Sequence, residues 1–313
     1  MPIYLINKKE KAPLEVLFVY IGVCVMITPI LSNNYQSNYN PNFKGLEINK
    51  IPPFKNYINK TFDRFAQVSK TRWHAIDRSL EPNLKVVKKK FGDHVLHAMD
   101  INPYNEKKYI IFFHGIGQNV TSNQALYKRI IDKGYGILSC EYGNFGSNTE
   151  KLTTKSIQNT ADMAIKHLKS QNINDIGVVG YSAGGFPALE TAVAAGENCK
   201  FLVLISPINS LKDEFNNVAK GNMVKLPKIV KFVLKKIPFI FNSLENILNL
   251  KQTIKKNNAP TYMIYSIKDS VVPPTSTENL SKQINNLRGI VKLKEGGHSI
   301  DDGKLDAFSN LPL

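Results

Sequence analysis

From about residue 84 onward, short apolar runs alternate with segments of helical composition, and this alternation constrains the fold more than any other feature. Continuous runs of Val, Ile, Leu, Phe and Tyr are typical of strands buried on both faces of a parallel sheet. We expect such strands at 109–113, 136–141, 176–180, 201–205 and 261–265, with an early antiparallel strand at 93–101 and an edge strand at 289–296. Helices are expected at 123–133, 154–170, 184–195 and 275–287. The chain is therefore predicted to have an α/β fold, with a mostly parallel central sheet flanked by helices.

The strand at 176–180 runs directly into the pentapeptide Gly180-Tyr181-Ser182-Ala183-Gly184. A serine at a sharp turn between a strand and a helix projects its hydroxyl above the sheet, and glycines flank it because side chains would collide in so tight a bend. This pattern predicts a nucleophile elbow with Ser182 as the nucleophile. The alternative is a glycine- and serine-rich turn that has no chemical role.

A neutral serine hydroxyl is a poor nucleophile and needs a base. Of the six histidines, only His298 follows Ser182, and it comes just after the last expected strand. Gly296 and Gly297 precede it and allow the backbone to approach a site closely. We therefore predict His298 as the base. Four other histidines are expected to be structural or solvent-facing: His74, His94, His97 and His167.

The base needs an acid to orient it, in the chain order serine, acid, histidine. Asp269 lies just past the strand at 261–265. Asp213 falls at the start of a long insertion, and Glu278 falls within an expected helix. Asp269 is therefore the predicted acid. Asp301 and Asp302 resemble the N-terminal cap of a helix.

The reaction also needs donors for the oxyanion that forms when serine attacks a carbonyl group. The backbone N–H of Ala183, at the start of the expected helix, is the first candidate. The second should come from the loop after strand 109–113, where His114-Gly115-Ile116-Gly117 forms a glycine-rich turn. We predict the N–H of Ile116 here, with Gly117 as the second choice, and expect His114 to support this loop.

Together these residues resemble the α/β-hydrolase superfamily, nearest its membrane-anchored serine-hydrolase branch. The resemblance covers about residues 84 to 305 and rests on four features in the correct order: His-Gly-x-Gly, Gly-x-Ser-x-Gly-Gly, Asp269 and Gly-Gly-His. It implies an α/β-hydrolase fold that cleaves a carboxylic ester or thioester through an acyl-enzyme, without a metal or organic cofactor. Family members commonly carry Asp-Tyr-Arg-Gly-x-Gly after the fourth strand, whereas this chain has Gly143 and Asn144 in place of Arg-Gly.

A second function remains open at this point. The same fold can serve as a non-catalytic module that binds a ligand or a partner at a membrane. The presence of Ser182, Asp269 and His298 argues against that alternative without removing it.

The N-terminal region contains an apolar run from Leu14 to Leu31, with Glu15 as its only charge. A helix of this length reaches about 27 Å, close to the thickness of a bilayer core. Three lysines precede the run, which favours a signal anchor with the N-terminus in the cytoplasm and the remainder in the periplasm or lumen. A cleaved signal peptide followed by secretion is the alternative, although no Ala-x-Ala-like site follows.

These features predict four regions. Residues 1–13 form a basic segment, 14–31 a transmembrane anchor, 32–83 a polar stalk and pre-domain segment, and 84–313 the α/β-hydrolase domain with a lid insertion at about 209–258. The lid contains lysines and phenylalanines between residues 224 and 250 that could meet lipid head groups and an acyl chain, or could simply pack the lid and face solvent.

Composition adds little about partners. The formal net charge is +16, but nucleic-acid motifs, dinucleotide fingerprints and phosphate-binding glycine loops are lacking in the sequence. We therefore expect a small-molecule or lipid acyl ester as the substrate, contact with a membrane, and no nucleic-acid partner. Cys24, Cys140 and Cys199 show no metal-binding spacing.

Overall fold

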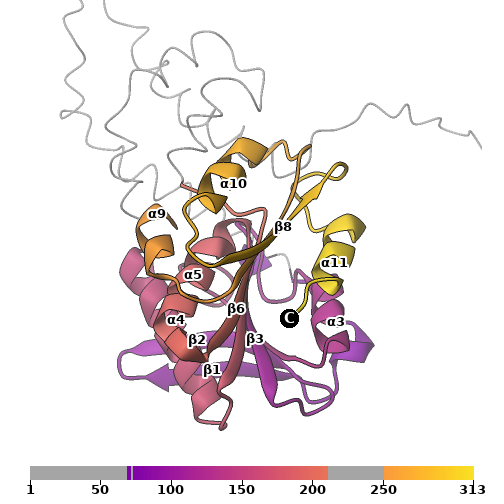
Figure 1. Cartoon of the computed structure of the whole chain (residues 1–313). Helices are drawn as coiled ribbons and strands as arrows, with labels where there is room; N and C mark the ends of the chain where they lie inside the picture. The colour runs from indigo at the N-terminus through magenta and orange to yellow at the C-terminus, as the bar shows by residue number, and fades with distance from the viewer. Residues whose placement is uncertain (1–68, 72, 211–249) are drawn as a thin grey trace, which may run out of the picture.

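The computed structural model describes residues 69–71, 73–210 and 250–313. Within these ranges eight strands form one sheet in the order β1-β2-β4-β3-β5-β6-β7-β8 (Figure 1). The strand β2 runs opposite to the other seven, which are parallel to one another. The strands are β1 (Lys85–Phe91), β2 (His94–Ile101), β3 (Lys108–Phe113), β4 (Gly136–Cys140), β5 (Asp175–Tyr181), β6 (Cys199–Ile205), β7 (Thr261–Ser266) and β8 (Leu287–Leu293).

The connections reverse direction at the middle of the sheet. From β3 the chain moves outward to β4 on one side, and it then returns to place β5 on the other side of β3. The loops that leave the carboxyl ends of β3 and β5 therefore diverge. In open α/β sheets such a switch point is where a crevice for ligands forms.

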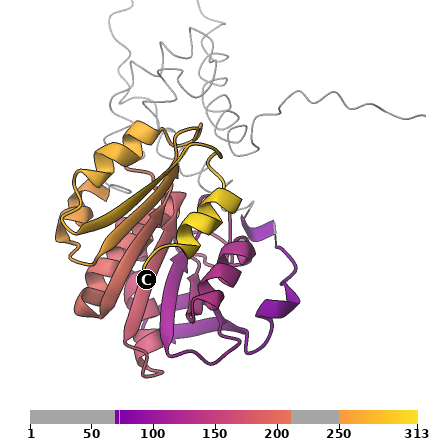
Figure 2. The ribbon, with the colours of Figure 1, turned by 45° about the vertical axis from the view of Figure 1, so that its right-hand side comes forward.

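Helices cover both faces of the sheet. On one face lie α3 (Gln124–Asp132) and α11 (Asp302–Ser309), which contact each other; Figure 2 shows the yellow α11 beside α3. The other face carries α4 (Thr154–Lys169) and α5 (Gly185–Ala195), together with α9 (Leu250–Thr253) and α10 (Pro274–Ser281). Short 3-10 turns complete the described elements: η2 (Arg78–Leu80), η3 (Ser182–Gly184), η4 (Gly196–Asn198) and η5 (Ile254–Lys256).

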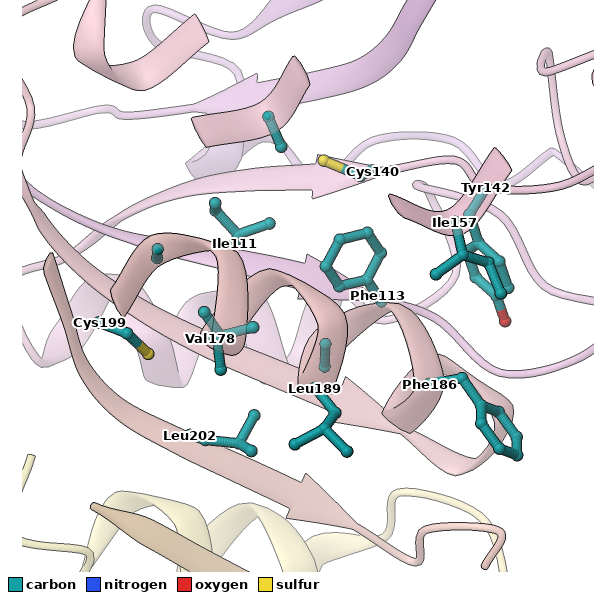
Figure 3. Packing of buried hydrophobic residues seen from close by; sticks show 14 of the residues in the cluster. Ile111, Phe113, Cys140, Tyr142, Ile157, Val178, Phe186, Leu189, Cys199 and Leu202 are labelled. Carbon is teal, nitrogen blue, oxygen red and sulfur yellow. The ribbon is translucent and has the colours of Figure 1, made fainter. Parts of the chain in front are cut away.

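Two apolar cores follow from the alternation of side chains along each strand. Ile111 and Phe113 of β3 point into the core beneath α5, where they join Val178 and Leu189 (Figure 3). Ile110 and Phe112 point the other way, toward α3 and α11. Cys140 and Cys199 are buried and unpaired, and burial raises the pKa of the Cys199 thiol to about 12.

The expected strands are present, and two elements differ from the sequence analysis. The strand β1 was not expected, because "KVVKKKF" has neither a continuous apolar run nor a regular alternation of apolar and polar residues, and most of its positions are exposed. It lies at an edge, where lysines discourage pairing with another chain. The helix expected at 275–287 ends at Ser281, because the chain turns there before it enters β8 at Leu287.

Several predictions concern residues outside the described ranges. These are the anchor at Leu14–Leu31, most of the expected stalk, and residues 211–249 of the expected lid. The described end of the stalk region contacts the domain: Leu80 is buried, and Asn119 donates to the carbonyl of Ser69. No helix within residues 69–71, 73–210 and 250–313 is both long and apolar enough to cross a bilayer.

Candidate active site

Ser182 begins the 3-10 turn η3, directly after β5, and its side chain is buried. Its φ of +54° lies in the left-handed region, which non-glycine residues rarely adopt and which is common at functional sites. Gly180 and Gly184 flank Ser182, and a side chain at either position would collide with neighbouring backbone atoms. A Cβ at Gly180 would lie 2.5 Å from the carbonyl oxygen of Gly184, and a Cβ at Gly184 would collide with the carbonyl oxygen of Phe113.

The structure brings Ser182, His298 and Asp269 together in one hydrogen-bonded chain. His298 Nε2 lies 2.9 Å from Ser182 Oγ, and His298 Nδ1 lies 2.8 Å from Asp269 Oδ2. A carboxylate can only accept, so Nδ1 carries the proton and the lone pair of Nε2 faces the serine hydroxyl. All three side chains are buried. This arrangement can remove the proton from Ser182 as its oxygen attacks an electrophile.

Asp269 is itself fixed by backbone donors. Its Oδ1 accepts hydrogen bonds from the N–H groups of Val271 and Val272, at 2.9 and 2.8 Å. These bonds leave Oδ2 free to face His298. The carboxylate therefore has one orientation, and it holds the imidazole in the tautomer that the reaction requires.

The loop after β3 lies against the elbow. A Cβ at Gly115 would be 3.4 Å from Ser182 Cβ, which places this loop beside the serine. Residues 115–118 form a turn closed by Gln118 N–H and the Gly115 carbonyl, and Gly117 has the φ of +72° that a type II turn needs at its third position. That hydrogen bond does not use the N–H of Ile116. The N–H of Ala183 lies in the first turn of a helical segment, where N–H groups have no helical acceptor.

His114 supports this loop through a hydrogen-bond contact with the Gly115 carbonyl. Its side chain is fully buried, with Nδ1 2.9 Å from the carbonyl of Gly115 and Nε2 2.9 Å from Glu141 Oε2. Glu141 also accepts from the N–H of Val120, and Tyr142 donates to the carbonyl of His114. The sequence analysis expected the supporting role of His114 but missed Glu141. The only available signal was its position at the carboxyl end of β4.

Two further side chains near His298 were not predicted. Tyr181 packs its ring against the imidazole, with ring centroids 5.4 Å apart, and donates to the carbonyl of His298. Lys304 on α11 is fully buried and donates to the carbonyls on both sides of His298. Their roles depend on contacts made in the folded chain, so the local sequence pattern gave no signal for them. In the described part of the chain no group of three metal-ligating side chains is found.

The expected helix cap at Asp301 is present. Asp301 caps α11 by accepting from the N–H of Lys304, and Asp302 lies in its first turn. His97 is buried on β2, and burial lowers its pKa, with Lys88 adding to the effect. Glu278 lies on α10, where it is bonded to Tyr265 and Lys292.

Comparison with known proteins agrees with the fold. No family model matches the chain. The Pyrococcus furiosus esterase Pf2001 superposes with a TM-score of 0.60 at 17% identity, over 76% of this chain and 92% of that esterase. The Exiguobacterium antarcticum esterase EaEST gives 0.54 at 16% identity, over 72% and 97%. Est1E from Butyrivibrio proteoclasticus, solved with ferulic acid bound, gives 0.53 at 18% identity, over 69% and 91%. The described residues share the fold of these esterases.

Two proteins are similar in sequence. The Mycoplasma pneumoniae protein named "Putative esterase/lipase 2" is 22% identical over 108 residues, which are 34% of this chain and 40% of that protein. The uncharacterized Bacillus subtilis protein YqkD is 20% identical over 249 residues, 76% of each chain. The match to the Mycoplasma protein thus spans less than half of that protein's length.

Proposed function

We propose that the chain is a serine hydrolase that cleaves a carboxylic ester or thioester through an acyl-enzyme. The observation that carries the proposal is the buried hydrogen-bonded line from Ser182 through His298 to Asp269. The esterases with the same fold and the similarity to the Mycoplasma protein support ester hydrolysis as the reaction class.

In the proposed mechanism, Ser182 Oγ attacks the carbonyl carbon while His298 Nε2 takes the hydroxyl proton. Asp269 stabilises the imidazolium that forms. The N–H groups of Ile116 and Ala183 donate to the oxyanion. His298 then protonates the leaving alcohol or thiol, which departs and leaves the acyl group on Ser182. A water molecule, deprotonated by His298, attacks this acyl-enzyme and releases the acid.

The substrate is proposed only as an acyl ester, either a small molecule or a lipid. A panel of p-nitrophenyl and coenzyme A esters of graded chain length would test the reaction and define the acyl group. We expect Ser182→Ala to lower kcat/KM by at least ~10⁴-fold on every ester that the wild type cleaves.

The matched control is Ser170→Ala. Ser170 is exposed and follows α4, near the amino end of β5, whereas Ser182 follows its carboxyl end. This variant should keep wild-type activity. If the wild type cleaves no ester in the panel, or if Ser182→Ala retains full activity, the proposal is wrong. Binding of an ester without turnover would support the non-catalytic ligand-binding alternative.

A further inference from the structure

The loop that carries His298 is held by buried side chains over its central residues. It joins β8 to α11, and the carbonyl groups of five consecutive residues, 295–299, lie within hydrogen-bond distance of side-chain donors. Ser266 Oγ shares its one hydrogen between the carbonyls of Glu295 and Gly296, at 3.0 and 2.6 Å. Lys304 Nζ donates to the carbonyls of Gly297 and Ser299 at 2.5 and 2.9 Å, and Tyr181 OH donates to that of His298 at 3.2 Å.

Lys304 stands out among these donors because it is charged. Its side chain has no exposed surface, and the carboxylate that pairs with it, Asp301 Oδ2, is 3.9 Å away and partly exposed. Burial lowers the pKa of Lys304, while Asp301 and Asp269 oppose this effect. A buried lysine costs free energy that an apolar side chain of similar length would not. If residue 304 served only to pack α11 against the sheet, a methionine there would stabilise the fold more than a lysine.

The loop needs this constraint because of its own sequence. Gly296 has a φ of +86°, and a Cβ at Gly297 would meet nothing within 4 Å. Two glycines next to His298 give the backbone more freedom than other residues would. The imidazole must nevertheless stay within hydrogen-bond reach of both Ser182 and Asp269, since a displacement of about 1 Å can reduce a rate by about 100-fold.

We propose that Lys304 is a positioning residue for His298, which fixes the backbone on both sides of the imidazole. This inference rests on the proposed function. The bond to Gly297 restrains the flexible side of the loop, and the bond to Ser299 restrains the side that leads into α11.

The test compares Lys304→Met, Lys304→Gln and a control, with kcat and KM measured on an ester that the wild type cleaves. Lys304→Met keeps most of the side-chain length and removes the donors; it should lower kcat about 10- to 100-fold with KM nearly unchanged. Lys304→Gln restores a donor. It should recover part of kcat.

The control is Lys133→Met. Lys133 also donates to a backbone carbonyl, that of Leu311, but at the end of α3 and far from His298 in the chain. It should leave kcat and KM unchanged. A folded Lys304→Met with wild-type kcat overturns the inference, as does a lower melting temperature alone. Failure of both Lys304 variants to fold assigns the residue to stability and overturns it too. A wild type without esterase activity is a different result, because it removes the proposed function itself.

Discussion

Ser182 and His298 should act as one unit, because the imidazole has a role in the proposed chemistry only through the serine it bonds. Ser182→Ala and His298→Ala should each lower kcat/KM severely, and the double variant should be no more than a few-fold worse than either single variant. Steady-state kinetics on one activated ester would measure all three. Additive losses, in which the two factors multiply, would show that the residues act separately.

Asp100 offers a residue-scale prediction about stability. It lies on β2, accepts from Tyr109 OH at 3.0 Å, and burial raises its pKa. Because the folded-state pKa is above the unfolded value, the ionised carboxylate costs stability at neutral pH, and this cost disappears on acidification once both states are protonated. Asp100→Asn keeps an acceptor for Tyr109. It should raise the melting temperature by a few degrees at pH 7.

The difference between Asp100→Asn and wild type should shrink to nothing near pH 3. Asp162→Asn, on the exposed face of α4, is the control and should change the melting temperature little at either pH. Equal melting temperatures for wild type and Asp100→Asn at pH 7 would contradict this account of the buried carboxylate.

At the scale of elements, the junction of β5 and α5 requires a glycine at position 184 but should accept an alanine at position 185. A Cβ at Gly184 would collide with the backbone carbonyls of Phe113 and His114, so Gly184→Ala should displace the loop after β3 and nearly abolish activity. A Cβ at Gly185 would meet Pro207 at 3.5 Å, an ordinary contact, and alanine favours a helix. Gly185→Ala should therefore fold at least as stably as wild type. Similar activity in both variants would show that the close approach at Gly184 is not needed.

The elements also show what a sequence can predict. The buried strands were predictable because a strand covered on both faces must be apolar throughout, as in β5 and β6. The strand β1 was not, because an edge strand exposed on most positions has no such requirement. The end of α10 was missed because residues 282–286 have helical composition but turn toward β8.

Some residues of the candidate site could likewise be predicted from the sequence, and others could not. Ser182, Asp269 and His298 could be chosen because each stands at the carboxyl end of an expected strand, within a recognisable local pattern. Their mutual distances come from the structure. Glu141 and Lys304 could not be chosen, since burial and partners give them their roles, and in the sequence each is an ordinary charged residue.

At the scale of the whole molecule, the proposed catalytic groups come from loops at the carboxyl ends of β3, β5, β7 and β8. The strands β3 and β5 flank the switch point of the sheet, which is where ligands bind in open α/β sheets. The topology thus brings the loop that contains Ile116 beside Ser182, although the two segments are distant in sequence.

We propose that the apolar run Leu14–Leu31, which lies outside the described residues, anchors the chain with residues 32–313 on the non-cytoplasmic side. The lysines before the run favour this orientation. Protease added to sealed vesicles of cytoplasm-out orientation should spare the catalytic domain and digest it after detergent is added. Alkaline carbonate should not extract the protein. Digestion in intact vesicles would reverse the topology, and a soluble chain that begins near Ser32 would indicate a cleaved signal peptide.

The central claim is that Ser182 is the nucleophile and that His298 activates it. Mass spectrometry of the full chain after reaction with a fluorophosphonate tests this claim most directly, since the probe traps an activated serine without requiring the natural substrate. The account predicts one adduct, on the peptide that contains Ser182, absent in Ser182→Ala and formed far more slowly in His298→Ala. An unmodified wild type, an adduct on a different serine, or equal labelling of wild type and His298→Ala would contradict it.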